Sequence, residues 1–279
     1  MRNRILIATL VTLTLAVAVS MAQAPQAPAA ARPAAPAAYR APRTADGKPN
    51  LNGIWQAMNT ANWDIEAHSA QPSPIKDLGA TGAIPGGAGI VEGGTIPYLP
   101  DALKKKKENQ ANRLKLDPEV KCYLPGVPRS VYMPYPFQII QSTKHIMMLH
   151  EYAGAVRTVY MTDQTEPPAD SWMGWSNGKW EGETLVVDTK GFNDQSWFDR
   201  AGNFHSDALH VVERFTARSA DTLNYEATIE DSKTFSRPWK ISMPLYRHVE
   251  ANAQIMEFRC VEFVEDLLYG HLKKQPASK

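Results

Sequence analysis

The chain has 279 residues, and its 30 lysine and arginine residues nearly balance its 29 aspartate and glutamate residues, for a formal net charge of +1. Because nucleic-acid binding rests on clustered cations, this balance predicts that no nucleic acid is a partner. The dense basic run at residues 104–107 is better explained as a solvated helix face than as a polyanion site.

The first residues predict a secretory signal peptide at 1–24. Arg2 and Arg4 precede an apolar run over residues 5–19, and residues 22–24 (Ala-Gln-Ala) form a small-residue cleavage site. The apolar run is shorter than the about 20 residues of a membrane span. We therefore expect cleavage, a periplasmic or secreted protein, and no transmembrane span afterwards. The mature chain would carry 28 basic against 29 acidic residues, a formal charge of −1.

Residues 25–43 consist almost entirely of Ala, Pro and Gln. Such a segment cannot bury enough apolar surface to fold, so it predicts a linker or tether. A single domain is expected over residues 44–272, because a segment of this length suits one large all-β domain. Residues 273–279 are then a tail.

The chain has two cysteines, Cys122 and Cys260. In an oxidising compartment an even pair favours a disulfide, with two buried free thiols as the alternative. Closing so long a loop would stabilise the fold by roughly 4 kcal/mol in the chain-entropy model.

The first predicted strand is Leu51–Trp55. Gly53 and Trp55 form a G-x-W pattern that recurs at Gly178 and Trp180. Glycine lets the backbone pass closely while tryptophan closes one end of a barrel. The pattern resembles the first strand of lipocalin-like (calycin) barrels, and this resemblance implies a barrel that binds a small molecule.

Several longer stretches carry a second resemblance: DGKPNLNGIW, CYLPGVPR, YPFQI, WEGETLVVDTKGF and HSDALHVVERF. Together they extend over nearly all of the mature chain. They resemble a family of uncharacterised secreted bacterial proteins, which implies export and no particular activity.

Residues 72–100 are rich in Gly and Pro and predict a long loop, a common place for lids and binding loops. Residues 101–116 predict a helix, with Asp101 as its N-cap. The pair Asp117 and Pro118 should end that helix.

Residues 122–137 are rich in proline and predict irregular structure. They include Arg129 and Tyr135. These side chains either cap a pocket as ligand-binding residues, or lie across a barrel end with Arg129 satisfied by carbonyl oxygens.

From residue 138 onward, β-branched and aromatic residues predict strands joined by short connections. The expected strands are 138–141, 145–152, 156–161, 184–189, 208–217, 222–229, 239–249 and 254–261. Successive antiparallel neighbours of this kind close into a barrel or a strongly curled sheet. The fold class is therefore mostly β, with one or two short helices, the second over residues 264–272.

The stretch 172–214 is the predicted location of a functional site, because it combines four tryptophans with a dense polar cluster. An enzyme hypothesis takes His205, Asp207, His210 and Asp199 as catalytic residues. Histidine titrates near neutral pH and can act as acid or base. A neighbouring carboxylate would fix the tautomer of the histidine.

Further residues of the same stretch are candidates for ligand binding. Strand alternation puts His210 and Arg214 on one face, where they could grip an anionic or carbonyl group. Asp194 could supply a second acid, and Trp175 and Trp197 could line a cavity. The tryptophans fill a barrel core under the alternative interpretation, which aromatic burial favours.

Two other interpretations stay open for the polar cluster. Its histidines and acids could form no more than a hydrogen-bonded turn. Metal binding by His205, Asp207 and His210 is disfavoured, because strand spacing puts His210 on the opposite face. No metal and no cofactor is predicted, and the nucleotide and hydrolase motifs are missing from the sequence.

The sequence thus predicts first a secreted or periplasmic β-barrel that binds a small apolar or carbonyl- or carboxylate-bearing molecule. The second hypothesis is an enzyme on the same scaffold that performs proton transfer or hydrolysis. The third is a structural envelope protein. The oligomeric state is not indicated.

Overall fold

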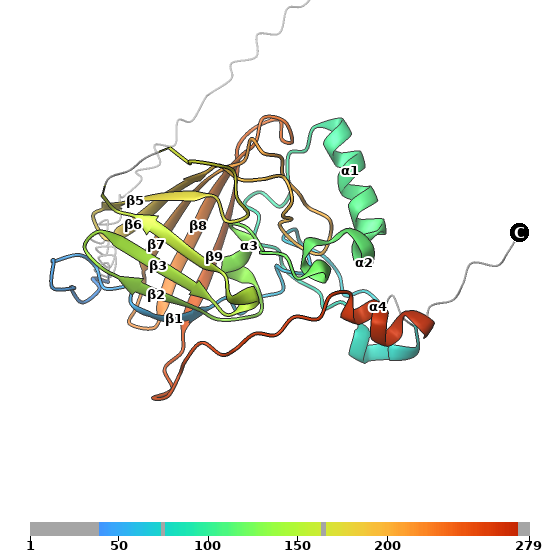
Figure 1. The fold of residues 1–279 in the computed structure, drawn as a ribbon, viewed down its shortest axis with the longest axis horizontal. Helices are drawn as coiled ribbons and strands as arrows, with labels where there is room; N and C mark the ends of the chain where they lie inside the picture. The colour runs from blue at the N-terminus through green and yellow to red at the C-terminus, as the bar shows by residue number, and fades with distance from the viewer. Residues whose placement is uncertain (1–38, 74–75, 163–165, 273–279) are drawn as a thin grey trace, which may run out of the picture. The chain divides into compact units, whose positions relative to one another are not determined.

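The computed structural model describes residues 39–73, 76–162 and 166–272. Nine strands within these ranges form one closed barrel in sequence order, with the last strand paired to the first (Figure 1). The mostly-β barrel prediction is confirmed. The strands are β1 (Gly53–Gln56), β2 (Phe137–Gln141), β3 (His145–His150), β4 (Val156–Tyr160), β5 (Trp175–Glu181), β6 (Thr184–Lys190), β7 (His210–Ala217), β8 (Thr222–Glu230) and β9 (Trp239–Arg247).

The strand pairing corrects two details of the sequence prediction. Neighbouring strands are antiparallel except β4 and β5, which are parallel with Val159 opposite Ser176. Residues 254–261, predicted as a strand, form none, and most of their side chains are exposed. An exposed segment without a ladder partner cannot satisfy the strand pattern that its residue types suggest.

Helices cover one end of the barrel, where Figure 1 shows α1 and α2 beside α3. The predicted helix over 101–116 is divided at Asn112, and Leu99 is its N-cap in place of Asp101. The proline-rich segment 122–137 contains a helical turn that was not predicted. The α-helices are α1 (Pro100–Ala111), α2 (Arg113–Leu116), α3 (Arg129–Tyr132) and α4 (Val264–Tyr269).

Short 3-10 helices complete the described structure. One of them interrupts the predicted loop at 72–100. They are Lys76–Gly82, Pro118–Lys121, Tyr152–Gly154 and Gly270–Leu272. In the part of the chain that the structure describes, no helix has both the length and the apolar character needed to cross a bilayer.

The G-x-W pattern of β1 closes the barrel. Trp55 is fully buried and donates its indole N–H to the carbonyl of Leu51 at 2.9 Å. The guanidinium of Arg247, at the end of β9, lies 4.2 Å from the Trp55 ring. A side chain at Gly53 would begin 2.0 Å from that guanidinium, so glycine is required here for the arginine to pass. Arg247 then donates to the carbonyl of Asn52 at 2.7 Å and joins the two strands.

The barrel lumen is filled with side chains. On β7, Val211, Glu213 and Phe215 alternate inward and are completely buried. The same period-2 pattern on β8 turns Tyr225 and Ile229 inward. Large side chains from both sides of the barrel therefore meet at its centre and form one hydrophobic core.

One ion pair lies inside this apolar core. Arg157, which points inward from β4, donates to both carboxylate oxygens of Glu213, with an Nη1 to Oε1 distance of 3.1 Å. Its other N–H groups donate to the hydroxyl oxygens of Ser176 and Thr189, each at 2.8 Å. Tyr225 donates its hydroxyl to Glu213 at 2.9 Å. Side chains from three further strands, β5, β6 and β8, thus complete the hydrogen bonding of the guanidinium on β4 and the carboxylate on β7.

The disulfide between Cys122 and Cys260 is confirmed, across a sequence separation of 138 residues. The expected signal peptide, most of the expected linker and the tail at 273–279 lie outside the described residues. Tyr39 already packs against the core and Arg43 bridges to Pro49. Packed structure therefore begins a few residues before residue 44.

We predict that Arg157→Met lowers the free energy of unfolding by about 3–5 kcal/mol, because it leaves Glu213 charged and buried without a cation. The double variant Arg157→Met/Glu213→Leu should recover most of that loss. The matched control is Arg214→Met, which removes an exposed outward pair with Glu181 and should cost less than about 1 kcal/mol. Urea unfolding measures the free energy of unfolding of all three variants. Equal losses of stability in Arg157→Met and Arg214→Met would contradict the prediction.

Candidate functional site

Arg129 organises a buried charged cluster at the helix-covered end of the barrel. Its guanidinium, 2% exposed, donates to Asp117 at 3.1 Å and to Glu119 at 2.6 Å. Its Nε donates to the side chain of Asn62 at 2.9 Å. Side-chain oxygens accept the hydrogen bonds of Arg129, whereas one of the two interpretations of the sequence expected carbonyl oxygens to accept them.

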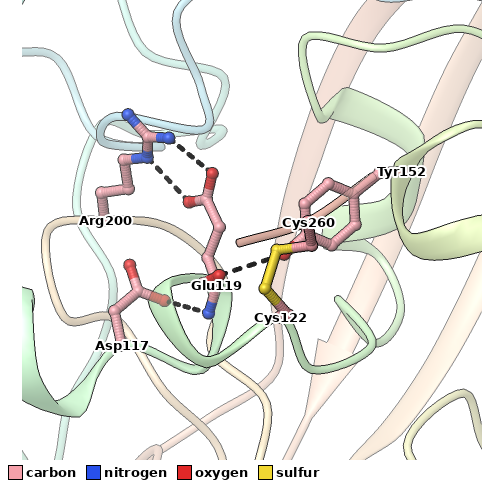
Figure 2. Close-up of a disulfide and its surroundings, with 6 residues drawn as sticks. All are labelled: Asp117, Glu119, Cys122, Tyr152, Arg200 and Cys260. Carbon is pink, nitrogen blue, oxygen red and sulfur yellow. Dashed lines mark hydrogen bonds and ion pairs between the residues drawn. A yellow bond between two sulfur atoms is a disulfide. The ribbon is translucent and has the colours of Figure 1, made fainter. Parts of the chain in front are cut away.

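Glu119 connects this cluster to a second arginine. Arg200 donates to the two carboxylate oxygens of Glu119 at 2.7 and 2.5 Å, a bidentate arrangement visible in Figure 2. Asp117 fixes the backbone at Glu119 by accepting its N–H at 2.9 Å. Burial opposes ionisation of Glu119, but its contacts with Arg200 and Arg129 outweigh burial and lower its pKa to about 2.

Asp199 lies beside the cluster and is completely buried. Its carboxylate accepts hydrogen bonds from the backbone N–H groups of Ile65, Ala201 and Asn203, and from the Asn203 side chain at 2.6 Å. Burial, together with the nearby carboxylate of Asp64, raises the pKa of Asp199 to about 7. These donors join the segment at Ile65 to the loop that contains Asp199, so Asp199 acts first as a structural anchor.

A cleft of about 630 Å³ opens above this cluster. It lies between the segment after β1, the α1–α2 junction and the loop that precedes β7. Its size falls within the range typical of small-molecule sites. The side chains that give the cleft its chemistry are Trp63, Asp64, His68, Arg113, Lys115 and Arg200.

Cations and one aromatic ring dominate the cleft wall. The guanidinium of Arg200 lies 4.4 Å from the Trp63 ring and that of Arg113 lies 5.8 Å from it. Arg113, Lys115 and Arg200 face a single lining carboxylate, that of Asp64. An aromatic or apolar ligand with an acceptor group would match such a wall.

His68 is held by backbone carbonyl groups at the rim of the cleft. Its Nδ1 lies 2.8 Å from the carbonyl oxygen of Glu66, and its Nε2 lies 3.1 Å from that of Pro85. A neutral imidazole has one N–H, which donates to one of these two carbonyl oxygens, and the imidazole thereby helps to fix the loop at the cleft.

The structure does not bring His205 and His210 together. His205 is buried between Phe192 and Phe198, with Nε2 2.7 Å from the Ser196 hydroxyl and Nδ1 2.8 Å from the Ser206 carbonyl. A carbonyl group, and not the expected carboxylate, thus fixes the tautomer. Burial lowers the pKa of His205.

His210, Asp207 and Arg214 lie on the outside of the barrel, each in an ion pair with another surface residue. His210 points outward from β7 and lies 3.0 Å from Asp188 and 3.3 Å from Glu230. Asp207 pairs with Lys233 at 2.6 Å. Arg214 pairs with Glu181 at 2.9 Å. These are exposed surface contacts, whose energetic value is small.

The remaining predicted residues are scattered. Trp175 stacks on Tyr160 at 4.5 Å between ring centroids, and Trp197 packs in a small apolar cluster beside α1. Asp194 is exposed. Tyr135 alone lies near the Arg129 cluster, where it lines a smaller cavity of about 250 Å³ together with Glu119 and Arg200.

Sequence reasoning missed Trp63, Arg113, Glu119 and Arg200. These residues come from three separate segments, and no local pattern links Trp63 or Arg200 to the run that contains Arg113 and Glu119. The dense acidic and basic run from Arg113 to Glu119, next to a predicted helix end, was the available signal. In the described ranges, no three His, Cys, Asp or Glu side chains are grouped closely enough to hold a metal ion.

Comparisons with known proteins add no family assignment. No protein-family model and no curated protein matches the chain. The site is therefore judged on its own geometry.

We predict that Glu119→Gln lowers the free energy of unfolding at pH 7 by about 3 kcal/mol, because it removes the carboxylate shared by two arginines. Since the folded pKa of about 2 lies below the ordinary value of 4.5, this stabilisation is complete above pH 4.5 and is lost as pH falls towards 2. The variant should therefore lose less stability than the wild type across that window.

The control for this experiment is Glu257→Gln, which removes an exposed partner of Arg259. Urea unfolding between pH 2 and 7 makes the comparison. Parallel stability curves for the wild type and Glu119→Gln below pH 4.5 would contradict the role given to Glu119.

Proposed function

We propose that this protein is an exported β-barrel that binds a small molecule in the cleft at the helix-covered end, outside the barrel lumen. The expected ligand has an aromatic or apolar body and a carbonyl or carboxylate group. The single observation that carries the proposal is the cleft of about 630 Å³ in which Trp63 lies beside the guanidinium groups of Arg113 and Arg200.

Two further features support this location. The lumen is occupied by completely buried side chains around the Arg157–Glu213 pair, which leaves the barrel wall as a rigid support. Arg200, which lines the cleft, is held by Glu119, and Glu119 is held in turn by Arg129, so this part of the wall is ordered before a ligand arrives.

Export is supported by the signal-peptide pattern at residues 1–24 and by the disulfide between Cys122 and Cys260. An enzyme built on His205, Asp207 and His210 has less support, because these side chains are separated and two of them lie in surface ion pairs. A purely structural role leaves a cleft lined by half-buried arginines unexplained.

The test uses 1-naphthaleneacetate as a probe, with binding measured by titration calorimetry. We predict that Trp63→Ala weakens binding about tenfold, because the ring supplies the aromatic wall of the cleft. The matched control is Trp180→Ala, a tryptophan in a separate cavity at residues 44–48 and 179–180, which should bind as the wild type does. Unchanged binding in Trp63→Ala, or no binding by the wild type, would overturn the proposal.

A further inference from the structure

Arg113 uses only part of its guanidinium within the protein. Its side chain, 10% exposed, lines the cleft from α2. Nη2 donates to Glu265 at 3.2 Å. Nη1 is buried and has no hydrogen-bond partner among the residues that the structure describes. A guanidinium has a fork of donors that suits a bidentate carboxylate, and Arg113 uses only one of its donors in the hydrogen bond to Glu265.

Glu265 comes from a C-terminal segment that is weakly packed. None of the residues of α4 is buried, and Leu267 and Leu268 are 71% and 52% exposed. The side chain of Glu265 is itself 32% exposed. An ion pair with such a partner is inexpensive to break. The contact between Glu265 and Arg113 can therefore be exchanged for a better one.

Covalent and aromatic tethers hold this segment in place. Cys260 is bound to Cys122, just beyond the Glu119 turn (Figure 2). Phe258 packs against both Tyr135 and Tyr152, with ring centroids 5.1 and 4.9 Å away. These tethers, a few residues before Glu265, keep its carboxylate at a high effective concentration around Arg113.

We propose that the cleft binds the carboxylate of an aromatic acid through Arg113, and that Glu265 is a tethered internal competitor for the same guanidinium. This inference rests on the proposed function. The free protein has Glu265 on Arg113, and the bound protein has the ligand carboxylate there. The disulfide keeps Glu265 close to Arg113. Loss of the disulfide therefore weakens the competition and raises the apparent affinity for the acid.

The chemistry distinguishes acids from their neutral analogues. A carboxylate gains a charge-assisted, bidentate contact with Arg113, whereas the corresponding amide gains no ionic contact and does not have to displace Glu265. The competition therefore acts on the acid alone. A partly exposed ion pair of ordinary strength would reduce the apparent affinity for the acid by about two- to fivefold.

The experiment compares 1-naphthaleneacetate with 1-naphthaleneacetamide by titration calorimetry on the disulfide-bonded full chain. Glu265→Gln should bind the acid about two- to fivefold more tightly and bind the amide with unchanged affinity. The matched control is Glu262→Gln, an exposed glutamate of the same segment, which should leave both affinities unchanged. Arg113→Gln should weaken binding of the acid about tenfold and abolish the preference for acid over amide.

The tether is tested with Cys122→Ser/Cys260→Ser. This double variant should bind the acid more tightly than the wild type. When Glu265→Gln is added to it, the total gain in binding free energy for the acid should be smaller than the sum of the two separate gains. Equal or weaker binding of the acid by Glu265→Gln overturns the inference, even if the cysteine variant does not fold. If both compounds bind in a manner that depends on Trp63 but Glu265→Gln changes neither affinity, the role of Glu265 as a competitor is refuted and the proposed function stands. If neither the wild type nor any variant binds either compound, the proposed function is refuted as well.

Discussion

The ion pair between Arg157 and Glu213 at the centre of the barrel constrains the rest of the molecule. A buried charge without a partner is far too costly to leave, so the strands that carry these residues must keep their register. Ser176, Thr189 and Tyr225 complete the hydrogen bonding and tie further strands to the same point. A barrel filled around such a pair has no interior to offer a ligand, and the proposed binding site therefore lies at its surface.

That surface lies at the helix-covered end, where a second set of buried charges is paired. Arg129 and Arg200 face Asp117 and Glu119, so the cluster beneath the cleft is neutral and satisfied within itself. The cations that are incompletely matched lie in the cleft wall, above this rigid floor. In the proposed function, the buried cluster stabilises the fold while the adjacent cleft wall binds the ligand, and Glu265 of the tethered C-terminal segment contacts that wall through Arg113.

Much of the fold could be predicted from the sequence, because period-2 alternation in β7 to β9 and the glycine and tryptophan of β1 are local signals. The parallel pairing of β4 with β5 could not, since it depends on a long connection. The site was largely missed because its residues also come together only through contacts between segments that are far apart in the sequence. Alternation separates the two faces of β7 correctly but does not say that Glu213 points inward and His210 outward. Arg129, Asp199 and Tyr135 were the predicted residues that the fold brings into or beside the buried charged cluster.

The most direct measurement of the central claim, a full lumen with recognition at the covered end, is a crystal structure of the protein with 1-naphthaleneacetate. The account predicts electron density for the naphthalene ring beside Trp63, with its carboxylate on Arg113 and with the Arg157–Glu213 pair intact. Density for the ring inside the barrel, with Arg157 and Glu213 parted to admit it, would contradict the account.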